Sequence, residues 1–400
     1  MWLLGLPFLL VSALAAFAQP VEGEVIGFDR VEELRPFLPV EFWQHRALFF
    51  YDGMQLEIGP ARRDYRPAPE YRAITERHSS SVKLGPDGSL VGYLAGQPFP
   101  MDAIDCAGDP QAGVKVAWNF DRRWQGNGSK HRFRTSFWDR GEELSAHLGK
   151  GTVVETAHRV ERAYAEQGGD LLPGKRLTRS VALYSVGAPF ELRGITLLHC
   201  RWKGSDPHTS WVYLPKDRRV RRFSGPDLGR ALPGTDFVLE DLEGFGGRVM
   251  DYAWECRGAA ELLAPMNTRV AGYPYAERRF GPTGLSFADD RFELRRTVTL
   301  RLVPKHAGHP LAAKDLIVDA ETLEPLYSFA YDRKGELWKV AWHAHRWSGD
   351  ALGEIPAAAW YPGWEGVPEP RDLRTVADAS ANVQTGSGTR SERWDDQGAP

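Results

Sequence analysis

Apolar and polar residues alternate with a period of two along much of the second half of the chain, which predicts β-strands. The clearest example spans residues 291–303. One face of this strand would carry apolar side chains: Phe292, Leu294, Val298, Leu300 and Leu302. The other face would carry polar ones: Arg291, Glu293, Arg295, Thr297, Thr299 and Arg301. This pattern is typical of an antiparallel sheet with one covered and one solvated face.

Arg296 falls on the apolar face of this predicted strand. Two explanations are open at this point. The guanidinium is either an interior charge that has a partner, or it marks a β-bulge that shifts the register of the strand.

Other strand-like segments accompany this one: residues 153–164, 180–201, 209–214, 219–223, 248–256, 315–319, 326–331 and 336–345. Short turns, such as residues 332–335, separate consecutive segments, whereas parallel strands would need long crossovers. In the last segment Trp338, Val340, Trp342 and Ala344 share one face. The prediction is therefore one large antiparallel sheet.

Helical patterns are confined to the first 150 residues. Residues 39–48 and residues 69–79 predict two short helices, and residues 85–88 predict the turn of a hairpin. A longer helix is predicted over 109–124, with Asp109 as its N-cap and Pro110 at its first position. Its apolar side chains are spaced by four: Ala112, Val116, Phe120 and Trp124.

These patterns predict an α+β fold in which N-terminal helices cover a large, curved antiparallel β-sheet. The helices would enclose either a filled core or a pocket on the apolar face of that sheet. We divide the chain into residues 1–18, a mixed segment over 19–150 that includes the cover helix 109–124, the sheet over 151–350, and a polar C-terminal extension over 351–400. We expect the extension to be partly mobile.

Residues 1–18 contain no charged side chain and have a core rich in Leu and Val. Ala16-Phe17-Ala18 followed by Gln19 fits a small-x-small cleavage pattern, so we predict a signal peptide that is cleaved after Ala18. The apolar stretch is short for a bilayer span. The alternatives are an uncleaved anchor and a misassigned start. Export would deprive the protein of ATP and nicotinamide cofactors.

Composition changes this picture in two ways. The net charge of −3 gives no basic face of the kind that binds nucleic acid. The 14 Trp, 13 Tyr and 19 Phe suit sheet faces and apolar cavities. Of three cysteines, Cys200 and Cys256 lie in strand-like runs and are the favoured disulfide pair, which would leave Cys106 over. The alternative is three buried free thiols.

Six blocks of sequence resemble one bacterial family, in the order in which the family has them. They read YLAGQPFP from Tyr93, WNFDRRWQG from Trp118, SWVYLPKDRRVRR from Ser210, YAW from Tyr252 with Glu261 and Pro265-Met266-Asn267 after it, RFEL from Arg291, and YDRKGELW from Tyr331. Together they resemble the DUF1329 family, a family of unknown function, between Tyr71 and Trp342. Residues 265–268 read Pro-Met-Asn-Thr where the family pattern has Pro-Tyr-Asn-Asn.

This resemblance implies an exported protein of Gram-negative bacteria with a LolA/LolB-like fold, which is a half-open antiparallel barrel capped by helices around an apolar cavity. It also implies a role in outer-membrane lipoprotein sorting in the periplasm. An inner-membrane transporter of the resistance-nodulation-division class is the implied partner. The family has no established catalytic residues, so none is assigned to this chain.

Large apolar side chains of the predicted helix and strands are the candidates for lining the cavity. They are Trp118, Trp124, Trp211, Tyr213, Trp254, Phe292, Leu294, Val298, Trp338 and Trp342. A solid core would use the same residue types, so this assignment depends on the resemblance. The densest basic cluster would contact anionic headgroups or an acidic partner, or would lie in solvent at a hairpin tip. It consists of Arg218, Arg219, Arg221 and Arg222.

Motifs for catalysis or metal binding are weak. The histidine pairs lack a third ligand at a diagnostic spacing: His306 with His309 and His343 with His345. Three carboxylates are predicted to lie in loops: Glu240, Asp241 and Glu243. The sequence has no GxSxG elbow, no P-loop and no HExxH motif. We therefore predict no metal and no cofactor.

Three functions compete. The favoured one is a periplasmic carrier or chaperone that binds a lipid, a lipoprotein acyl chain or a sterol-like molecule in an aromatic-lined cavity, through burial of apolar surface. One alternative is a non-catalytic interaction subunit of an envelope export machine. The other is an exported hydrolase. The favoured prediction is of a non-enzymatic protein that binds no nucleic acid and does not insert stably into the membrane.

Overall fold

The computed structural model describes residues 19–126, 128–160, 169–185, 193–204, 206–224, 238–269, 281–347 and 373–394. The predicted signal peptide, residues 1–18, lies outside the described residues, as do residues 351–372 of the predicted extension. No helix within the described ranges is long and apolar enough to cross a membrane.

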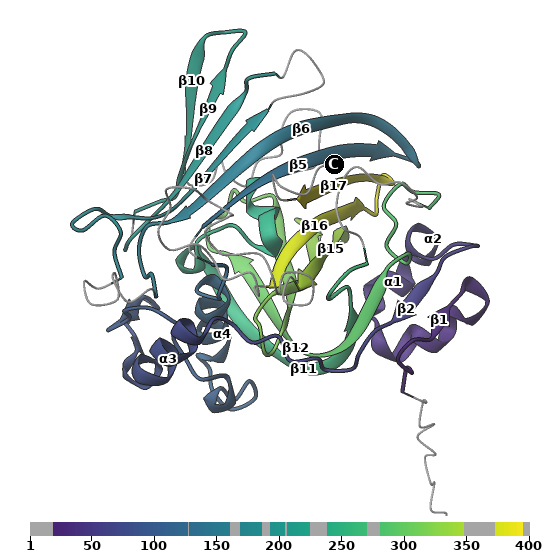
Figure 1. Ribbon diagram of the computed structural model, residues 1–400, viewed down its shortest axis with the longest axis horizontal. Coiled ribbons are helices and arrows are strands. Elements are labelled where there is room, and N and C mark those ends of the chain that lie inside the picture. The colour runs from purple at the N-terminus through teal and green to yellow at the C-terminus, as the bar shows by residue number, and fades with distance from the viewer. Residues whose placement is uncertain are drawn as a thin grey trace, which may run out of the picture.

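Within the described residues, fifteen strands form one open, curved sheet, in which β5 and β6 arch across the molecule (Figure 1). The order is β1-β2-β12-β13-β14-β15-β16-β17-β5-β6-β7-β8-β9-β10, and β11 also pairs with β12. The short pairing of β2 with β12 is parallel. The predicted curved sheet with helices in the first part of the chain is thus confirmed. The strands are β1 Val25–Ile26, β2 Leu56–Ile58, β5 Gly128–Asp139, β6 Glu142–Glu155, β7 Leu177–Ser185, β8 Thr196–Trp202, β9 Thr209–Leu214, β10 Arg219–Ser224, β11 Tyr252–Ala264, β12 Arg291–Pro304, β13 Leu311–Asp319, β14 Pro325–Asp332, β15 Leu337–Trp347, β16 Leu373–Asn382 and β17 Ser387–Trp394.

The helices are short, and most of those in the described residues precede β5. They are η1 Phe28–Phe37, α1 Val40–Gln44, α2 Arg46–Phe49, α3 Pro69–His78, η2 Ser79–Ser81, η3 Met101–Ala103, α4 Ala112–Asp121, η6 Leu239–Gly244 and η7 Val249–Asp251. The separate hairpin of β3 Lys83–Leu84 and β4 Leu90–Val91 contains the predicted turn. Pro69 begins α3, as its fixed φ angle favours.

Helix α4 is shorter than the predicted helix over 109–124. The carboxylate of Asp109 accepts the N–H of Gln111 within the preceding loop, and the helix begins one residue later. It ends at Asp121, so Trp124 does not lie on the helix. The periodicity of four continues beyond the end of the helix because Trp124 packs against Tyr71 of α3, with ring centroids 5.5 Å apart.

The C-terminal strands join the two halves of the sheet. β16 and β17 pair with each other and connect β15 to β5. The predicted boundaries differ from this arrangement: residue 150 falls inside β6, and residues 373–394 form strands where a partly mobile extension was expected. Ala377, Ala379 and Ala381 are buried on β16. Such small side chains give only a weak apolar signal in the sequence.

Strand register divides the sheet into two faces. We call one the α1 face, because its side chains join the hydrophobic cluster that contains Phe42 of α1: Tyr327, Phe329, Val340, Trp342 and Ala379. We call the other the α4 face, because its side chains join the cluster around α4: Val298, Leu300, Leu302, Leu316 and Val318. In Figure 1, α1 and α2 lie on one side of the view and α3 and α4 on the other.

Aromatic rings dominate the α1 face. Phe42 stacks on Phe287 with ring centroids 4.3 Å apart, and it meets Phe49 and Tyr327 edge-on at 4.9 and 5.1 Å. Trp342 contacts Phe287 edge-on at 5.3 Å. These are the geometries that aromatic pairs prefer. The α1 and α2 helices are therefore held to the sheet by interlocking rings.

Helix α4 lies directly on β11 and β12. A Cβ atom added at Gly113 would lie 2.6 Å from the backbone of Trp254, so the helix approaches the strand as closely as glycine allows. Asn119 fixes the chain before the helix: its side-chain amide donates to the carbonyl of Phe99 at 2.7 Å and accepts the N–H of Phe99 at 2.9 Å.

A disulfide joins Cys106, in the segment before α4, to Cys256 on β11. Cys200 is buried and has a free thiol. The predicted pair Cys200–Cys256 is therefore wrong, and so is the alternative of three free thiols. The sheet order explains the error, since β8 carries Cys200 on the far side of β5 from the β11–β12 pair. Strand-like composition does not reveal such a separation.

All five apolar residues predicted for one face of β12 are buried, but they divide between two clusters: Phe292 and Leu294 join the α1-face cluster, and Val298, Leu300 and Leu302 join the α4 cluster. The polar face is not solvated as predicted. Glu293 and Arg295 are buried because Tyr65 covers them and donates to Glu293 at 2.7 Å, while Arg295 pairs with Asp319 at 2.7 Å. Arg296 is exposed opposite Glu261 in unbroken register. It is therefore neither an interior charge nor the site of a bulge.

Candidate functional site

The predicted cavity residues do not meet around one space. Phe292, Leu294 and Trp342 belong to the α1-face cluster, whereas Trp118, Trp254 and Val298 belong to the α4 cluster. Trp124 packs near Tyr71. Trp211 and Tyr213 lie on β9, where Tyr213 is exposed, and Trp338 lies beside a small pocket between η6 and the sheet. The aromatic residues thus serve several separate packing sites.

The space between α4 and the strands beneath it is filled. Val116, Ala117 and Phe120 of the helix are at most 1% exposed, and Leu300 and Leu316 of the sheet are fully buried against them. Phe245 closes the same cluster. The hollow predicted beneath this helix is therefore absent from this position, and any ligand must bind elsewhere.

The predicted basic cluster lies at the β9–β10 hairpin. Arg219, Arg221 and Arg222 are exposed, and Arg218 occupies the turn with a positive φ of 49°. Arg221 lies 3.8 Å from Asp217, which is also exposed. These charges lie in solvent at the edge of the sheet.

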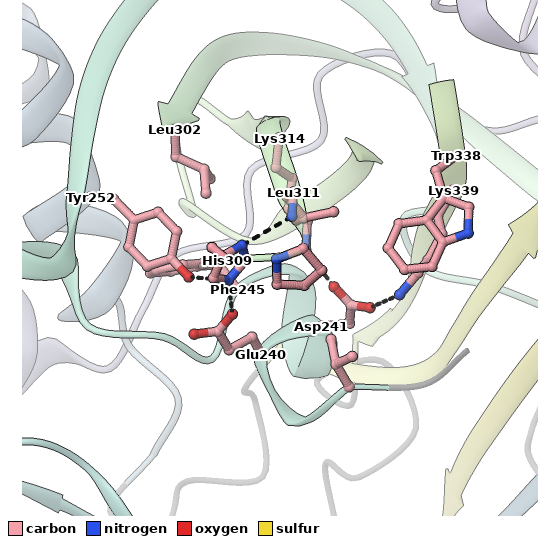
Figure 2. Close-up of a pocket in the computed structure, with 12 residues that line it drawn as sticks. Glu240, Asp241, Phe245, Tyr252, Leu302, His309, Leu311, Lys314, Trp338 and Lys339 are labelled. Atoms are coloured by element: carbon pink, nitrogen blue, oxygen red, sulfur yellow. Dashed lines mark hydrogen bonds and ion pairs between the residues drawn. The ribbon is translucent and has the colours of Figure 1, made fainter. Parts of the chain in front are cut away.

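A short acidic segment, η6 (Leu239–Gly244), crosses the α4 face against β14, β15 and β16. It carries the three carboxylates that sequence reasoning placed in loops. Figure 2 shows two of them, Glu240 and Asp241, pointing to basic side chains of the sheet and its turns. The third, Glu243, has a positive φ of 52° and points to a different group of residues.

Glu240 and Asp241 hold the segment in place. Glu240 accepts from His309 at 2.9 Å, and Asp241 accepts from Lys314 at 2.9 Å and Lys339 at 2.8 Å (Figure 2). Burial by itself would raise the pKa of Asp241, but the two ammonium groups hold it well below its usual range. The pocket among these residues has a volume of about 10 Å³, which is space for a single water.

The histidine pairs are dispersed. His309 lies in the pocket of Figure 2, 3.3 Å from Tyr252, whereas His306 is exposed. His345 bonds the carbonyl of Pro325 at 2.6 Å, and His343 is buried beside a register shift in β15. Within the described ranges, no three His, Cys, Asp or Glu side chains are placed to hold a metal ion.

Glu243 reaches a group of arginines that come from three separate parts of the chain. Its carboxylate lies 2.9 Å from Arg393 of β17, 3.4 Å from Arg179 of β7 and 3.7 Å from Arg123 after α4. Gln125 donates to it at 3.0 Å. These arginines hold the pKa of Glu243 well below its usual range, although burial opposes them.

A polar cavity of about 60 Å³, which we call the arginine cavity, lies next to Glu243. Its walls include Tyr71, Tyr93, Trp124 and Gln125. The charged lining has five arginines and two carboxylates: Arg122, Arg123, Arg159, Arg179, Arg201, Asp121 and Glu155. By a measure in which one water needs about 10–15 Å³, this is room for roughly four waters.

In contrast to Glu243, four other titratable groups near the arginine cavity have pKa values shifted toward their neutral forms. Burial raises the pKa of Glu324, which pairs with Arg123 at 3.0 Å, to about 7. Burial, reinforced by nearby arginines, lowers the pKa of His158 and of His199 to about 3. Burial likewise raises the pKa of Glu155. Burial therefore disfavours the charged forms of these four groups.

The same face becomes apolar farther along the strands. Glu155, Arg179 and Arg201 are cross-strand neighbours on β6, β7 and β8. Partly buried apolar side chains lie on this face two to four residues along the strands from these charged residues. Val153 of β6 pairs with Val181 of β7, and Leu183 of β7 pairs with Leu197 of β8, which in turn pairs with Val212 of β9. Residues two apart on a strand are separated by about 7 Å.

Glycines flatten this apolar area. A Cβ atom at Gly149 would lie 2.2 Å from the ring of Phe133, and one at Gly151 would lie 2.2 Å from the ring of His131. Each ring of β5 therefore lies across a glycine of β6, its partner strand. We call this partly buried area the open apolar area. Its residues are Phe133, Phe137, Val153, Val181, Leu183, Leu197 and Val212.

Residues 43–362 match the family model described as DUF1329, protein of unknown function. The chain belongs to this family. The predicted resemblance is therefore confirmed. Among curated proteins, an uncharacterized protein of Pseudomonas aeruginosa is 27% identical over 301 residues, a match that spans 70% of this chain and 61% of the relative.

Three solved structures are similar to this one in fold. A domain from Vibrio parahaemolyticus, whose name refers to outer-membrane lipoprotein sorting, is 17% identical with a TM-score of 0.47 over 73% of this chain and 95% of that one. A DUF1329 protein from Desulfovibrio piger has the same identity and coverage with a TM-score of 0.45. A LolA superfamily protein from Nitrosomonas europaea is 12% identical with a TM-score of 0.36, over 69% and 88% of the two chains.

Sequence reasoning missed both the arginine cavity and the open apolar area. A signal was available on β7, where Arg179, Val181 and Leu183 share one face of the strand. The sequence could thus have predicted a charged residue at the end of an apolar strand face. The convergence of Glu243 and Arg393 on Arg179 was not, because it depends on contacts between distant segments.

Proposed function

We propose that this protein is an exported, non-enzymatic carrier in the periplasm that binds a hydrophobic molecule, such as a lipid or a lipoprotein acyl chain, on the open apolar area of the α4 face. The observation that carries this proposal is the row of partly buried apolar side chains on β6–β9, including Val181, Leu183 and Leu197. Covering such surface with a ligand is favourable by about 25 cal/mol per Å². The predicted signal peptide, cleaved after Ala18, supports the location.

This proposal moves the ligand from the position that sequence reasoning chose. The cluster around helix α4 is tightly packed, so Phe120 and its neighbours leave no cavity that a ligand could occupy. The open apolar area instead lies on β5–β9, whereas α4 packs on β11 and β12 and its last residue, Asp121, pairs with Arg201 of β8 at 3.1 Å. A transporter of the resistance-nodulation-division class would be the partner that delivers or receives the ligand, as the resemblance implied.

The test is extraction of protein purified from the periplasm with organic solvent, followed by mass spectrometry. We expect one class of apolar molecule at close to one equivalent per chain. The Leu197→Glu variant should lose this molecule, because the carboxylate would enter the open apolar area. Leu198→Glu is the matched control, since Leu198 is the next residue and lies on the opposite face. The proposal would be contradicted if wild-type protein yielded no more of this apolar molecule than the Leu197→Glu variant.

A second candidate function, a docking subunit of an envelope machine, is favoured by the opposite face of the same strands. Four large apolar side chains are exposed there: Tyr184, Leu198, Tyr213 and Val220, at 47%, 38%, 39% and 62%. Register places Tyr213 beside Val220. If the Leu198→Glu variant lost its function in cells while the Leu197→Glu variant kept it, docking to a partner would replace ligand transport as the proposed function.

A third function, hydrolysis, has the cluster of Tyr252, His309 and Glu240 as its best candidate in the described residues (Figure 2). Hydrolysis requires a space where a substrate atom reaches the reacting groups. The pocket there holds one water at most. The geometry therefore favours a structural role for this cluster, in which it fixes η6 to the sheet.

A further inference from the structure

The arginine cavity and the open apolar area lie on one face of the same three strands. Arg179 is two residues from Val181 on β7, and Arg201 is four residues from Leu197 on β8, so each strand passes from charged to apolar along this face. A ligand that lies along the strands would therefore meet arginines at one end, then His199 beside Val181, and aliphatic side chains farther along.

We propose that the arginine cavity binds the anionic group of an amphiphilic ligand, a phosphate or a carboxylate, while its hydrocarbon chain covers the open apolar area. This inference rests on the proposed carrier function and assigns the chemical class of the ligand. It further assigns Glu243 as the group that occupies these arginines when no ligand is bound.

The excess of positive charge around the cavity favours binding of an anion. Five arginines face two carboxylates in the lining, and adding Glu243, Glu324 and Arg393 still leaves six positive and four negative groups. Four guanidinium nitrogens of the lining are buried without a hydrogen bond, and three of them form ion pairs: Arg179 Nε lies 3.0 Å from Glu155, Arg122 Nε 3.4 Å from Asp121 and Arg123 Nη2 3.7 Å from Glu243. They are Arg122 Nε, Arg123 Nη2, Arg179 Nε and Arg201 Nε. Buried donors normally find acceptors, and the oxygens of an anion would supply them.

Size and geometry support a headgroup. A volume of about 60 Å³ fits one phosphate or carboxylate but not a hydrocarbon chain. Arginine is suited to these groups because its planar fork donates two parallel hydrogen bonds to them. The chain of the ligand must therefore leave the cavity, and the partly buried side chains of β6–β9 are the nearest apolar surface on this face of those strands.

Glu243 is placed to compete with such a ligand. It reaches Arg179, Arg123 and Arg393 from the acidic segment, and its backbone has the strained left-handed φ of 52°. Gly244 follows with a φ of 80°, where a Cβ atom would lie 2.7 Å from Pro325. An incoming anion would exchange partners with Glu243, so removal of its charge should favour the ligand.

The test compares a fluorescent fatty acid with its uncharged analogue. Parinaric acid and methyl parinarate share one hydrocarbon chain and differ in the carboxylate. We expect wild-type protein to bind the acid at least tenfold more tightly than the ester. Arg201→Gln should reduce this preference to less than threefold, and Glu243→Gln should strengthen acid binding. Arg222→Gln is the matched control and should match wild type, because Arg222 is an exposed arginine of β10 that pairs with Trp211 on the opposite face of the sheet.

The outcomes separate this inference from the carrier function. Equal binding of acid and ester by wild-type protein would overturn the headgroup site while leaving an apolar carrier intact. Binding of neither probe would overturn both. Calorimetry with inorganic phosphate distinguishes the source of the anion: micromolar binding of phosphate without binding of parinaric acid would assign the cavity to a free anion and overturn the amphiphile. Loss of acid preference in Arg222→Gln would move the headgroup site to the hairpin.

Discussion

The two ends of the α4 face are built from the same sheet and differ in what covers them. Where α4 lies on β11 and β12, Phe120 and Leu300 are sealed from solvent. On β6–β9, Leu183, Leu197 and Val212 remain partly exposed. Packing in the first region leaves no room for a ligand, whereas the second region retains apolar surface that a ligand would cover. The difference indicates that stability and binding are assigned to separate parts of one face.

The largest expected effect comes from opening the packed region. Phe120→Ala should lower the free energy of unfolding by about 4 kcal/mol, because it removes a fully buried ring and leaves a cavity. Chemical denaturation of wild type and variant measures this loss. If the two proteins were equally stable, the α4 cluster would not be the packed core that we describe.

The disulfide should rank next. Cys256→Ser removes the bond to Cys106, which closes a loop of 150 residues beside α4, and should cost about 3 kcal/mol. Binding of parinaric acid by the folded variant should not change, since the bond lies at the packed region. A large fall in affinity with an unchanged melting temperature would show that the two regions are not separate.

Stability should also depend on pH through Glu324. Its pKa is raised in the folded state, so the stability that its protonation contributes is present at low pH and is lost as the pH rises toward 7. Between pH 5 and 7 the free energy of unfolding of wild type should fall by about 2 kcal/mol relative to Glu324→Gln. Parallel denaturation series for the two proteins measure the difference. A difference that is constant or rises with pH would contradict the environment described for Glu324.

The smallest effect on stability is expected in the open apolar area. Leu197→Ala should change the free energy of unfolding by less than about 1 kcal/mol, because the side chain is only partly buried. The same change should weaken parinaric acid binding several-fold, as measured by fluorescence titration. A loss of stability as large as that of Phe120→Ala would place Leu197 in a packed core and remove the contrast between the two regions.

Much of the fold was readable from the sequence, and the reasons for the failures are physical. Period-two patterns identified β12 and its apolar side chains because those residues face a packed core. The buried Glu293 and Arg295 could not be foreseen, since Tyr65 comes from a segment far away in the sequence. The strands that join the two halves escaped notice because β16 buries alanines.

The candidate site was less readable than the fold. Aromatic composition pointed to a cavity, but rings such as Trp254 and Trp342 fill cores, and an indole in a core has the same sequence signature as one in a pocket. The acidic segment looked like a loop because its carboxylates find their partners only in three dimensions. Glu243 meets Arg393 across 150 positions of sequence.

Photocrosslinking with a diazirine-bearing palmitate tests the central contrast most directly. After irradiation and digestion, tandem mass spectrometry assigns each adduct to a residue. We predict adducts on the α4 face of β6–β9, at Leu183, Leu197 and Val212, and none around Phe120. Adducts confined to Leu198 and Tyr213 on the opposite face, or adducts no more frequent than on denatured protein, would contradict the account.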